Sequence, residues 1–305
     1  TVDVWRSDLE RLVGQGRLVG GLFTPAPFVR VDDIHVENRW MLDMLATQAQ
    51  GKGLALVSPE QTPEEMEQYL AHPAFAGFKP YHTYSRERPT YHASLASYLP
   101  EWVWRMADEH GLVILLHLVR PGALADADNQ RVVREMCRRY PRAQLVLAHA
   151  ARGFHAPNTV KGLPALRGLN NVWFDMSAVC EPTAMKAILD EFGPRRLMWG
   201  TDFPVGIMRG TAVTVGDGFL WLYGDTLDWQ AQSPEVQPTL VALESLRALL
   251  RAIDDCCLND DDKQDIFCRN AQRLLGLRSE SGTLTEELYR HAKQRIPGGV
   301  QLLSK

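Results

Sequence analysis

Histidine and aspartate side chains follow several short apolar runs of this sequence, at the point where each run ends. His117 and His149 close two consecutive runs, and Asp202 follows a later one. An ionisable group at the end of an apolar run costs free energy unless it gains a partner. Imidazole nitrogens and carboxylate oxygens bind zinc and related divalent metals, so a metal is a strong candidate for that partner. The pattern therefore indicates metal-assisted acid–base chemistry.

Basic side chains occupy comparable positions. Lys79 ends another apolar run, and Arg152 comes shortly after His149. Lys79 could cap a neighbouring carbonyl or bind a substrate carboxylate, and together the two cations favour an anionic substrate. Asp175 lies inside an apolar run, where an ion pair in the core is the expected role. The histidines assigned to loops or helices are expected on the surface: His82, His92, His110 and His291.

Seven runs are apolar nearly throughout, as strands covered on both faces must be. These predicted strands span residues 19–24, 53–58, 77–81, 112–118, 145–150, 172–177 and 197–201. Amphipathic helical stretches separate them, with start signals such as Thr62-Pro63-Glu64-Glu65. Repeated strand–helix units imply right-handed parallel crossovers. The active site of such a fold forms at the carboxyl ends of the strands.

Seven strands are one short of an eight-stranded α/β barrel. A helix is predicted over residues 7–15, directly before the first run, which leaves no room for a preceding strand. We therefore predict an α/β fold of the (β/α)8 TIM-barrel type that lacks its first strand. A doubly wound sheet is the competing architecture, but the polar residues at the strand ends favour the barrel.

The composition excludes several classes of function. The 305 residues are 45% hydrophobic and 23% charged, with a formal net charge of -4. Lys and Arg are spread along the chain, so there is no electrostatic footprint for nucleic acid or an anionic membrane. No apolar run approaches the roughly 20 residues needed to span a bilayer. Five cysteines without scaffold spacing, and no secretory signal, predict a reduced cytoplasmic protein.

Five motifs at the strand ends are similar to those of the amidohydrolase-related barrels. They are Phe78-Lys79-Pro80, Leu116-His117, Leu147-Ala148-His149-Ala150-Ala151-Arg152, Val172-Trp173-Phe174-Asp175-Met176-Ser177 and Trp199-Gly200-Thr201-Asp202-Phe203-Pro204. The branch that the sequence resembles includes aminocarboxymuconate semialdehyde decarboxylase and related aromatic acid decarboxylases. The resemblance extends over roughly residues 5–277, and we expect a barrel domain over residues 1–277.

This resemblance implies a mononuclear divalent metal, usually zinc. The family holds it with an HxH pair on strand one, a histidine on strand five and an aspartate on strand eight, and His117 and Asp202 match the last two. His149 matches the strand-six histidine, which polarises the water or shuttles a proton. The sequence contains no HxH. We expect the missing strand and the missing ligands to be one element, lost from a truncated N-terminus; the alternative is a barrel that has lost its metal.

The resemblance further implies a metal-dependent hydrolase that attacks a small carboxylated substrate with a metal-activated water. Asp202 would take the proton of the water, His149 would assist, and Lys79 and Arg152 would bind the substrate. The alternative is a decarboxylase of the same family, in which His149 helps to hold the carboxylate and to protonate the carbanion. The long segment 205–238 is expected to form a lid or rim over the site.

The end of the chain differs from the rest. Residues 278–283 have the composition of a linker. Residues 284–305, with Ile296-Pro297-Gly298-Gly299-Val300, resemble the opening of the class III, pyridoxal-phosphate-dependent aminotransferases related to glutamate-1-semialdehyde aminomutase. This implies the start of a fused aminotransferase domain, without its cofactor lysine. An ordinary C-terminal helix is the alternative, and a non-catalytic barrel serving the fused domain is the second functional hypothesis.

Deleting residues 279–305 tests the predicted boundary. The helix places Leu284, Leu288 and Ala292 on one apolar face suited to a partner outside the barrel, so the barrel should melt at nearly the same temperature without it. Calorimetry of both forms measures the change. A drop of more than about 5 °C, which is more than ~1 kcal/mol for a protein of this size, would show that the helix is part of the barrel.

Overall fold

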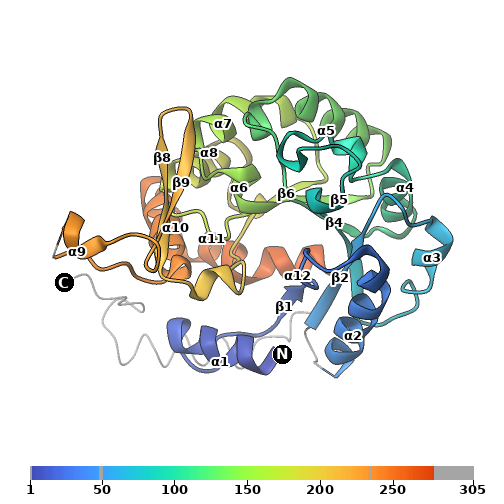
Figure 1. Ribbon diagram of the computed structural model, residues 1–305, viewed down its shortest axis with the longest axis horizontal. Coiled ribbons are helices and arrows are strands. Elements are labelled where there is room, and N and C mark those ends of the chain that lie inside the picture. Colours follow the sequence, from blue (N-terminus) through green and yellow to red (C-terminus); the bar gives the residue numbers. More distant parts are fainter. Residues whose placement is uncertain (1, 48–50, 234, 278–305) are drawn as a thin grey trace.

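Seven parallel strands form one curled sheet in the computed structural model, which describes residues 2–47, 51–233 and 235–277 (Figure 1). The strands are β1 (Gly21–Phe23), β2 (Gly51–Val57), β3 (Phe75–Pro80), β4 (Val113–Leu116), β5 (Gln144–Leu147), β6 (Val172–Asp175) and β7 (Leu197–Met198). Each strand pairs with the next one along the chain. Within the described ranges β7 does not pair with β1, so the sheet is an open half-barrel. The predicted α/β TIM-type fold, one strand short, is confirmed.

Helices connect the strands and surround the convex face of the sheet (Figure 1). The α-helices are α1 (Val2–Val13), α2 (Ile34–Ala46), α3 (Pro63–Glu67), α4 (Glu101–His110), α5 (Ala127–Arg139), α6 (Ala148–Arg152), α7 (Ala156–Gly162), α8 (Pro182–Phe192), α9 (Trp229–Gln232), α10 (Val241–Asp255), α11 (Asp260–Gln264) and α12 (Asn270–Leu274). Local sequence features determine where several of these helices begin or end. Thr62 and Glu65 form a capping box at the start of α3, and Gly111 ends α4 with a left-handed φ of 65°.

Shorter helical turns lie between these elements. The 3-10 helices are η1 (Val31–Asp33), η2 (His82–Tyr84), η3 (Thr90–His92), η4 (Leu95–Ser97), η5 (Ala123–Ala125), η6 (Leu163–Leu166), η7 (Pro194–Arg196) and η8 (Val205–Ile207), and η9 (Asp265–Arg269) is a π-helix. Two of them, η2 and then η3, come after β3 in the chain and supply His82 and Tyr91, whose rings lie 4.7 Å apart. They therefore bear on the candidate site.

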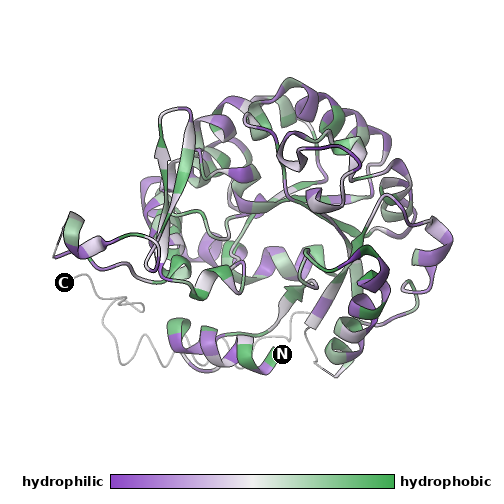
Figure 2. Ribbon diagram, viewed as in Figure 1, coloured by the Kyte–Doolittle hydropathy of each residue, from purple (hydrophilic) through white to green (hydrophobic). Residues whose placement is uncertain are grey.

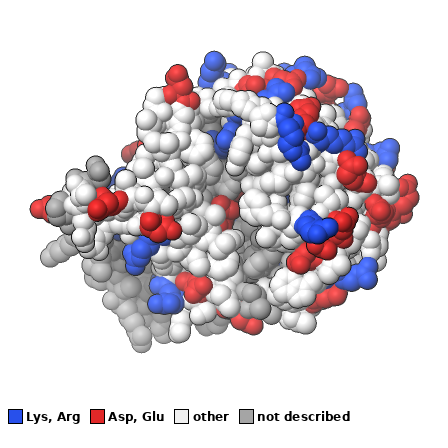
Figure 3. All heavy atoms as spheres, in the orientation of Figure 1, with Lys and Arg blue, Asp and Glu red and all other residues white. Residues whose placement is uncertain are grey.

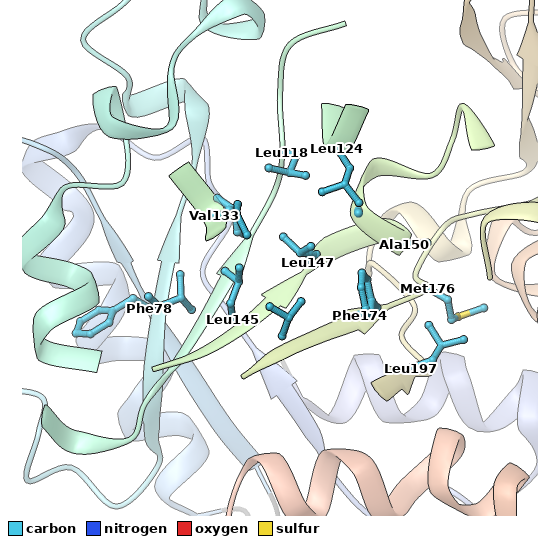
Figure 4. Close-up of a cluster of buried hydrophobic side chains, with 14 of the residues drawn as sticks. Phe78, Leu118, Leu124, Val133, Leu145, Leu147, Ala150, Phe174, Met176 and Leu197 are labelled. Atoms are coloured by element: carbon cyan, nitrogen blue, oxygen red, sulfur yellow. The ribbon is translucent and has the colours of Figure 1, made fainter. Parts of the chain in front are cut away.

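The main core lies between the sheet and the helices that cover it. Alternate strand residues such as Phe78, Leu145, Leu147 and Phe174 point into this layer, where they meet apolar helix side chains (Figure 4). Colouring by hydropathy shows the same pattern, with green concentrated on the strands and on the inward sides of the helices (Figure 2). Burial of this continuous apolar layer is what holds the strands in register.

The concave face of the sheet is covered by the last helix. Leu54, Val113, Val146 and Met198 point to this face, and Ala271, Leu274 and Leu275 of the α12 region pack against them. The π-helix η9 also contacts the edge of the sheet, because the amide of Trp199 donates to the carbonyl of Ile266 at 3.0 Å. The open edge after β7 is thus capped locally by helix backbone.

The segment predicted as a lid or rim contains a β-hairpin. Strands β8 (Gly210–Val215) and β9 (Gly218–Tyr223) pair antiparallel and form a second sheet. Figure 1 shows them at one side of the half-barrel, beside α7 and α8. The hairpin was not among the predicted strands, because its side chains do not form a buried apolar run.

Two further comparisons with the sequence predictions concern the ends of the chain. The first helix begins at Val2, earlier than the predicted 7–15. The linker 278–283, the segment 284–305 and His291 lie outside the described residues, so those expectations stay predictions. Among the described residues no helix is long and apolar enough to cross a membrane.

Replacing Gly77 by alanine should destabilise the fold strongly. Gly77 lies in β3 with a φ of +149°, and a Cβ there would come within 1.9 Å of the carbonyl oxygen of Val113 on the neighbouring strand. We expect a loss of about 3 kcal/mol in the free energy of unfolding, from backbone strain and a steric clash. Urea denaturation measures it, with Gly218→Ala as the control, since a Cβ at Gly218 meets nothing within 4 Å. Equal stability of the two variants would contradict this account of the β3–β4 contact.

Candidate active site at the carboxyl ends of the strands

Three histidines converge where β3, β4 and β5 end. The ring centroids of His117 and His149 are 5.1 Å apart, and those of His82 and His117 are 5.8 Å apart. The Tyr81 ring contacts both His82 (4.7 Å) and His117 (5.3 Å). Parallel strands bring these side chains together from separate parts of the chain, as expected for the carboxyl edge of an α/β sheet.

His149 is positioned by an unusual backbone. The chain leaves β5 at Leu147 and enters a turn in which residues 149–152 all have positive φ, between 51° and 63°. For residues other than glycine this conformation costs roughly 1–2 kcal/mol each, so neighbouring structure must hold it. The ring of His149 makes one such stabilising contact, because its Nδ1 lies 2.9 Å from the carbonyl oxygen of Ser177. A carbonyl only accepts, so Nδ1 carries a proton in this contact, and the hydroxyl of Ser177 lies 3.0 Å from the same nitrogen.

The expectation of a surface position was wrong for His82. Its side chain is buried, and Nδ1 is 3.0 Å from Oγ1 of Thr90. Burial first, then the nearby cations Arg152 and Lys79, lower the pKa of His82 to about 4. The turn η2 after β3 folds back over the strand ends, which places this side chain in the site. His92 and His110 are exposed, as expected.

Two cations line the site without an acid bonded to them. Lys79 is 6% exposed, and within the described ranges its ammonium forms no hydrogen bond or ion pair; it lies 5.5 Å from the Tyr81 ring. Burial lowers the pKa of Lys79, although Asp202 and Asp175 act in the opposite direction. Arg152 is half-buried and donates to the carbonyl of Arg120 at 2.7 Å. Such cations favour an anionic ligand.

The two carboxylates have different surroundings. Asp202 is exposed in the loop after β7, with a φ of 52°, and its charge acts on Lys79 and Tyr81. Burial and this carboxylate raise the pKa of Tyr81 to about 12. The core ion pair expected for Asp175 was wrong, since no described cation lies within ion-pair distance. Its Oδ1 instead accepts the backbone amide of Ser177 at 2.7 Å.

His117 has a buried ring nitrogen that could serve as a metal donor. Nδ1 of His117 is buried and has no hydrogen-bond partner, as a ring nitrogen that serves as a metal ligand would be. Burial, followed by the charges of His149, Lys79, Arg152 and His82, holds the pKa of His117 well below its usual value, so the ring is neutral. However, no group of three or more His, Cys, Asp or Glu that could hold a metal exists among the described residues.

Comparison with known families identifies the chain. The model of the amidohydrolase family matches residues 26–277. The chain belongs to the amidohydrolase family. The match covers strands β2 to β7 and every residue of the candidate site, and it begins after β1. None of the curated proteins with which the chain was compared matches it.

Solved structures show the same fold at low sequence identity. An amidohydrolase from Burkholderia multivorans with bound zinc has a TM-score of 0.60 and 17% identity, over 89% of this chain and 88% of that one. A probable 2-pyrone-4,6-dicarboxylic acid hydrolase from Acinetobacter baumannii, with citric acid bound, has a TM-score of 0.54 and 15% identity, over 90% of this chain and 89% of that one. The 5-carboxyvanillate decarboxylase from Sphingomonas paucimobilis has a TM-score of 0.53 and 14% identity, over 91% of this chain and 83% of that one. Amidohydrolase structures of this fold thus include hydrolases and decarboxylases.

Sequence reasoning missed the aromatic side chains that surround the amidohydrolase site. Tyr91 packs on His82 with centroids 4.7 Å apart, and Phe154 packs on His149 at 5.1 Å. A usable signal existed for Phe154, which follows Arg152 by two residues. Tyr91 and Phe219 come from a 3-10 turn and a hairpin, and no local pattern marks their position. Figure 3 shows that acidic and basic groups are mixed over the outer face of the molecule seen there, in contrast with the cations of the site.

Replacing Lys79 by methionine should stabilise the protein. The change removes a buried ammonium that has no hydrogen-bond partner and keeps the length of the side chain. We expect the free energy of unfolding at pH 7 to rise by about 1–3 kcal/mol. Urea denaturation measures the change, and Lys161→Met, on the exposed side of α7, should stay within about 0.5 kcal/mol of the parent. A destabilised Lys79→Met protein would mean that the ammonium has a structural role.

Proposed function

We propose that this chain is a hydrolase of the amidohydrolase family that acts on a small carboxylated substrate. The observation that carries the proposal is the combination of two histidines, His117 and His149, with two cations that have no bonded acid, at one edge of the sheet. The substrate carboxylate would bind Lys79 and Arg152. Its reacting carbonyl would then lie near His117 and His149, in a place where solvent is partly excluded.

Each site residue has a separate role in the proposed reaction. Nε2 of His149 can accept or return a proton, because its Nδ1 is committed to Ser177. Asp202, exposed at the mouth, would take the proton of the attacking water. Lys79 would stabilise negative charge on the substrate, and its burial strengthens that interaction. Hydrolysis balances when the water oxygen bonds to the carbonyl carbon, the C–N or C–O bond breaks, and the leaving group takes the proton.

A divalent metal, zinc by analogy with the family, would be held by Nδ1 of His117 and the carboxylate of Asp202. Bound there, it would supply a Lewis acid and lower the pKa of water from about 16 towards 7. Two protein donors are fewer than tight zinc sites have, so we expect the described residues by themselves to bind zinc weakly. One solved amidohydrolase of this fold contains zinc, which supports the choice of metal.

Decarboxylation is the second candidate function. The structures of similar fold include a 5-carboxyvanillate decarboxylase, and Lys79 and Arg152 would serve a carboxylate that leaves as well as one that only binds. In that reaction the C–C bond to the carboxylate breaks, carbon dioxide departs, and the carbanion takes a proton from His149. The two reactions differ in product: hydrolysis adds one water to the substrate, and decarboxylation removes one carbon dioxide.

A turnover screen tests the proposal. The protein, with zinc added, is incubated with amides, esters and lactones that carry a carboxylate, and with aromatic carboxylic acids, and products are identified by mass spectrometry. We expect hydrolysis of at least one member of the first group. His149→Gln should lower kcat about 100-fold or more, because it removes proton transfer. His110→Gln, on an exposed residue at the far end of α4, should leave kcat unchanged.

The outcomes separate the candidates. Water addition that depends on His149 supports the hydrolase, and carbon dioxide release supports the decarboxylase instead. Turnover that is equally fast in His149→Gln would reject the assigned site. Elemental analysis after dialysis adds a second readout: His117→Ala should bind less zinc than the parent, since it removes the free Nδ1 donor.

A further inference from the structure

The β8–β9 hairpin contacts the candidate site through aromatic rings. The ring of Phe154 lies 5.1 Å from that of Phe219 and 5.2 Å from that of Trp221, both on β9. The same Phe154 ring lies 5.1 Å from His149. A continuous line of ring contacts therefore runs from the hairpin to the histidine that the mechanism uses.

Phe219 also contacts Arg152 directly. The guanidinium carbon of Arg152 lies 5.7 Å from the centroid of the Phe219 ring, within the range of a cation–π interaction. On its other side, Arg152 donates a hydrogen bond to the carbonyl of Arg120. No ion pair to Arg152 occurs in the part of the chain that the structure describes. The ring of Phe219 and the carbonyl of Arg120 are thus the contacts that fix its head group.

Polar contacts hold the hairpin itself in place. The hydroxyl and amide of Thr214 both donate to Glu181, which stands at the start of α8. At the tip, Nε2 of His155 is 3.2 Å from the carbonyl of Gly216. These anchors come from the segment after His149 and from the loop after β6. The hairpin is therefore fixed to the strand-end loops and can hold a side chain in a set position.

We propose that Phe219 is a positioning residue, which aims the Arg152 guanidinium at the substrate carboxylate. The assignment of Arg152 to the substrate rests on the proposed function, whereas the contact between Arg152 and Phe219 does not. Residues 149–152 have a strained left-handed backbone, and Phe219 packs directly on the Arg152 side chain that this turn presents.

A double-mutant cycle tests the contact without any ligand. Unfolding constants in urea are measured for the parent, Phe219→Leu, Arg152→Met and the double variant. Leucine keeps apolar volume but lacks the aromatic face, so the cycle should show a coupling of about threefold or more in the unfolding constant. Phe219→Tyr keeps that face and should restore the coupling if leucine perturbs the hairpin. A cycle with no coupling would overturn the proposal.

Kinetics tests the positioning role. With the carboxylated substrate found in the turnover screen, Phe219→Leu should raise KM about fivefold with kcat nearly unchanged, because Arg152 binds the substrate before reaction. In the Arg152→Met background the same change should have no further effect, which a purely structural role would not produce. Leu220→Ala is the matched control, since Leu220 is the adjacent residue of β9 and is 53% exposed.

The unfolding cycle and the kinetic experiment together distinguish failure of the positioning role from failure of the proposed function. Coupling in the unfolding cycle together with a KM effect that depends on Arg152 supports the proposal. A KM for Phe219→Leu equal to that of Leu220→Ala would overturn the positioning role. If the parent turns over no carboxylated compound, the proposed function fails, and the unfolding cycle still decides the contact between Arg152 and Phe219.

Discussion

Because β1 to β7 run parallel, the chain leaves every strand at the same edge of the sheet, and the polar residues that follow the strands must share that edge. The contents of the candidate site follow from this constraint. His117, His149 and Lys79 are distant in sequence, yet the pairing of β3, β4 and β5 places them together. The helices on the convex face and α12 on the concave face exclude water around them, so each polar group there needs a partner or keeps a perturbed pKa.

The backbone at the end of β5 is strained, and contacts from other elements hold it in place. A left-handed turn over residues 149–152 would be unfavourable in isolation, and contacts from three other elements hold it. Ser177, after β6, accepts a hydrogen bond from the ring of His149; Arg120, after β4, accepts one from Arg152; and Phe219, on β9, packs against the Arg152 guanidinium. The rest of the fold thus determines where the two side chains point. A site built this way has little freedom to relax, which suits catalysis that depends on orientation.

The sequence was sufficient to predict the strands and the residues at their ends, because burial on both faces leaves a continuous apolar run that a polar residue visibly interrupts. His117 and Lys79 were found in this way. The same logic failed for His82 and Asp175. His82 follows its strand by two residues, and only the backward fold of η2 buries it. The left-handed turn is held by contacts from other elements, which no local pattern encodes. The hydrogen bond between Asp175 and Ser177 and the β8–β9 hairpin are local features that a search for buried apolar runs does not detect.

The two cations at this edge link stability to function. In a site meant only to be stable, a buried ammonium such as Lys79 would be replaced by an apolar side chain or paired with a nearby carboxylate. Here Asp202 is exposed, Asp175 is bonded to backbone, and Arg152 rests on an aromatic ring, so neither cation is neutralised by a bonded acid. Their field is therefore available to an anion, and a bound carboxylate would gain favourable interactions with both cations. An anionic substrate would supply the negative charge that Lys79 and Arg152 lack as a bonded partner. The two cations therefore indicate the class of substrate more specifically than the histidines do, since histidines serve many kinds of reaction.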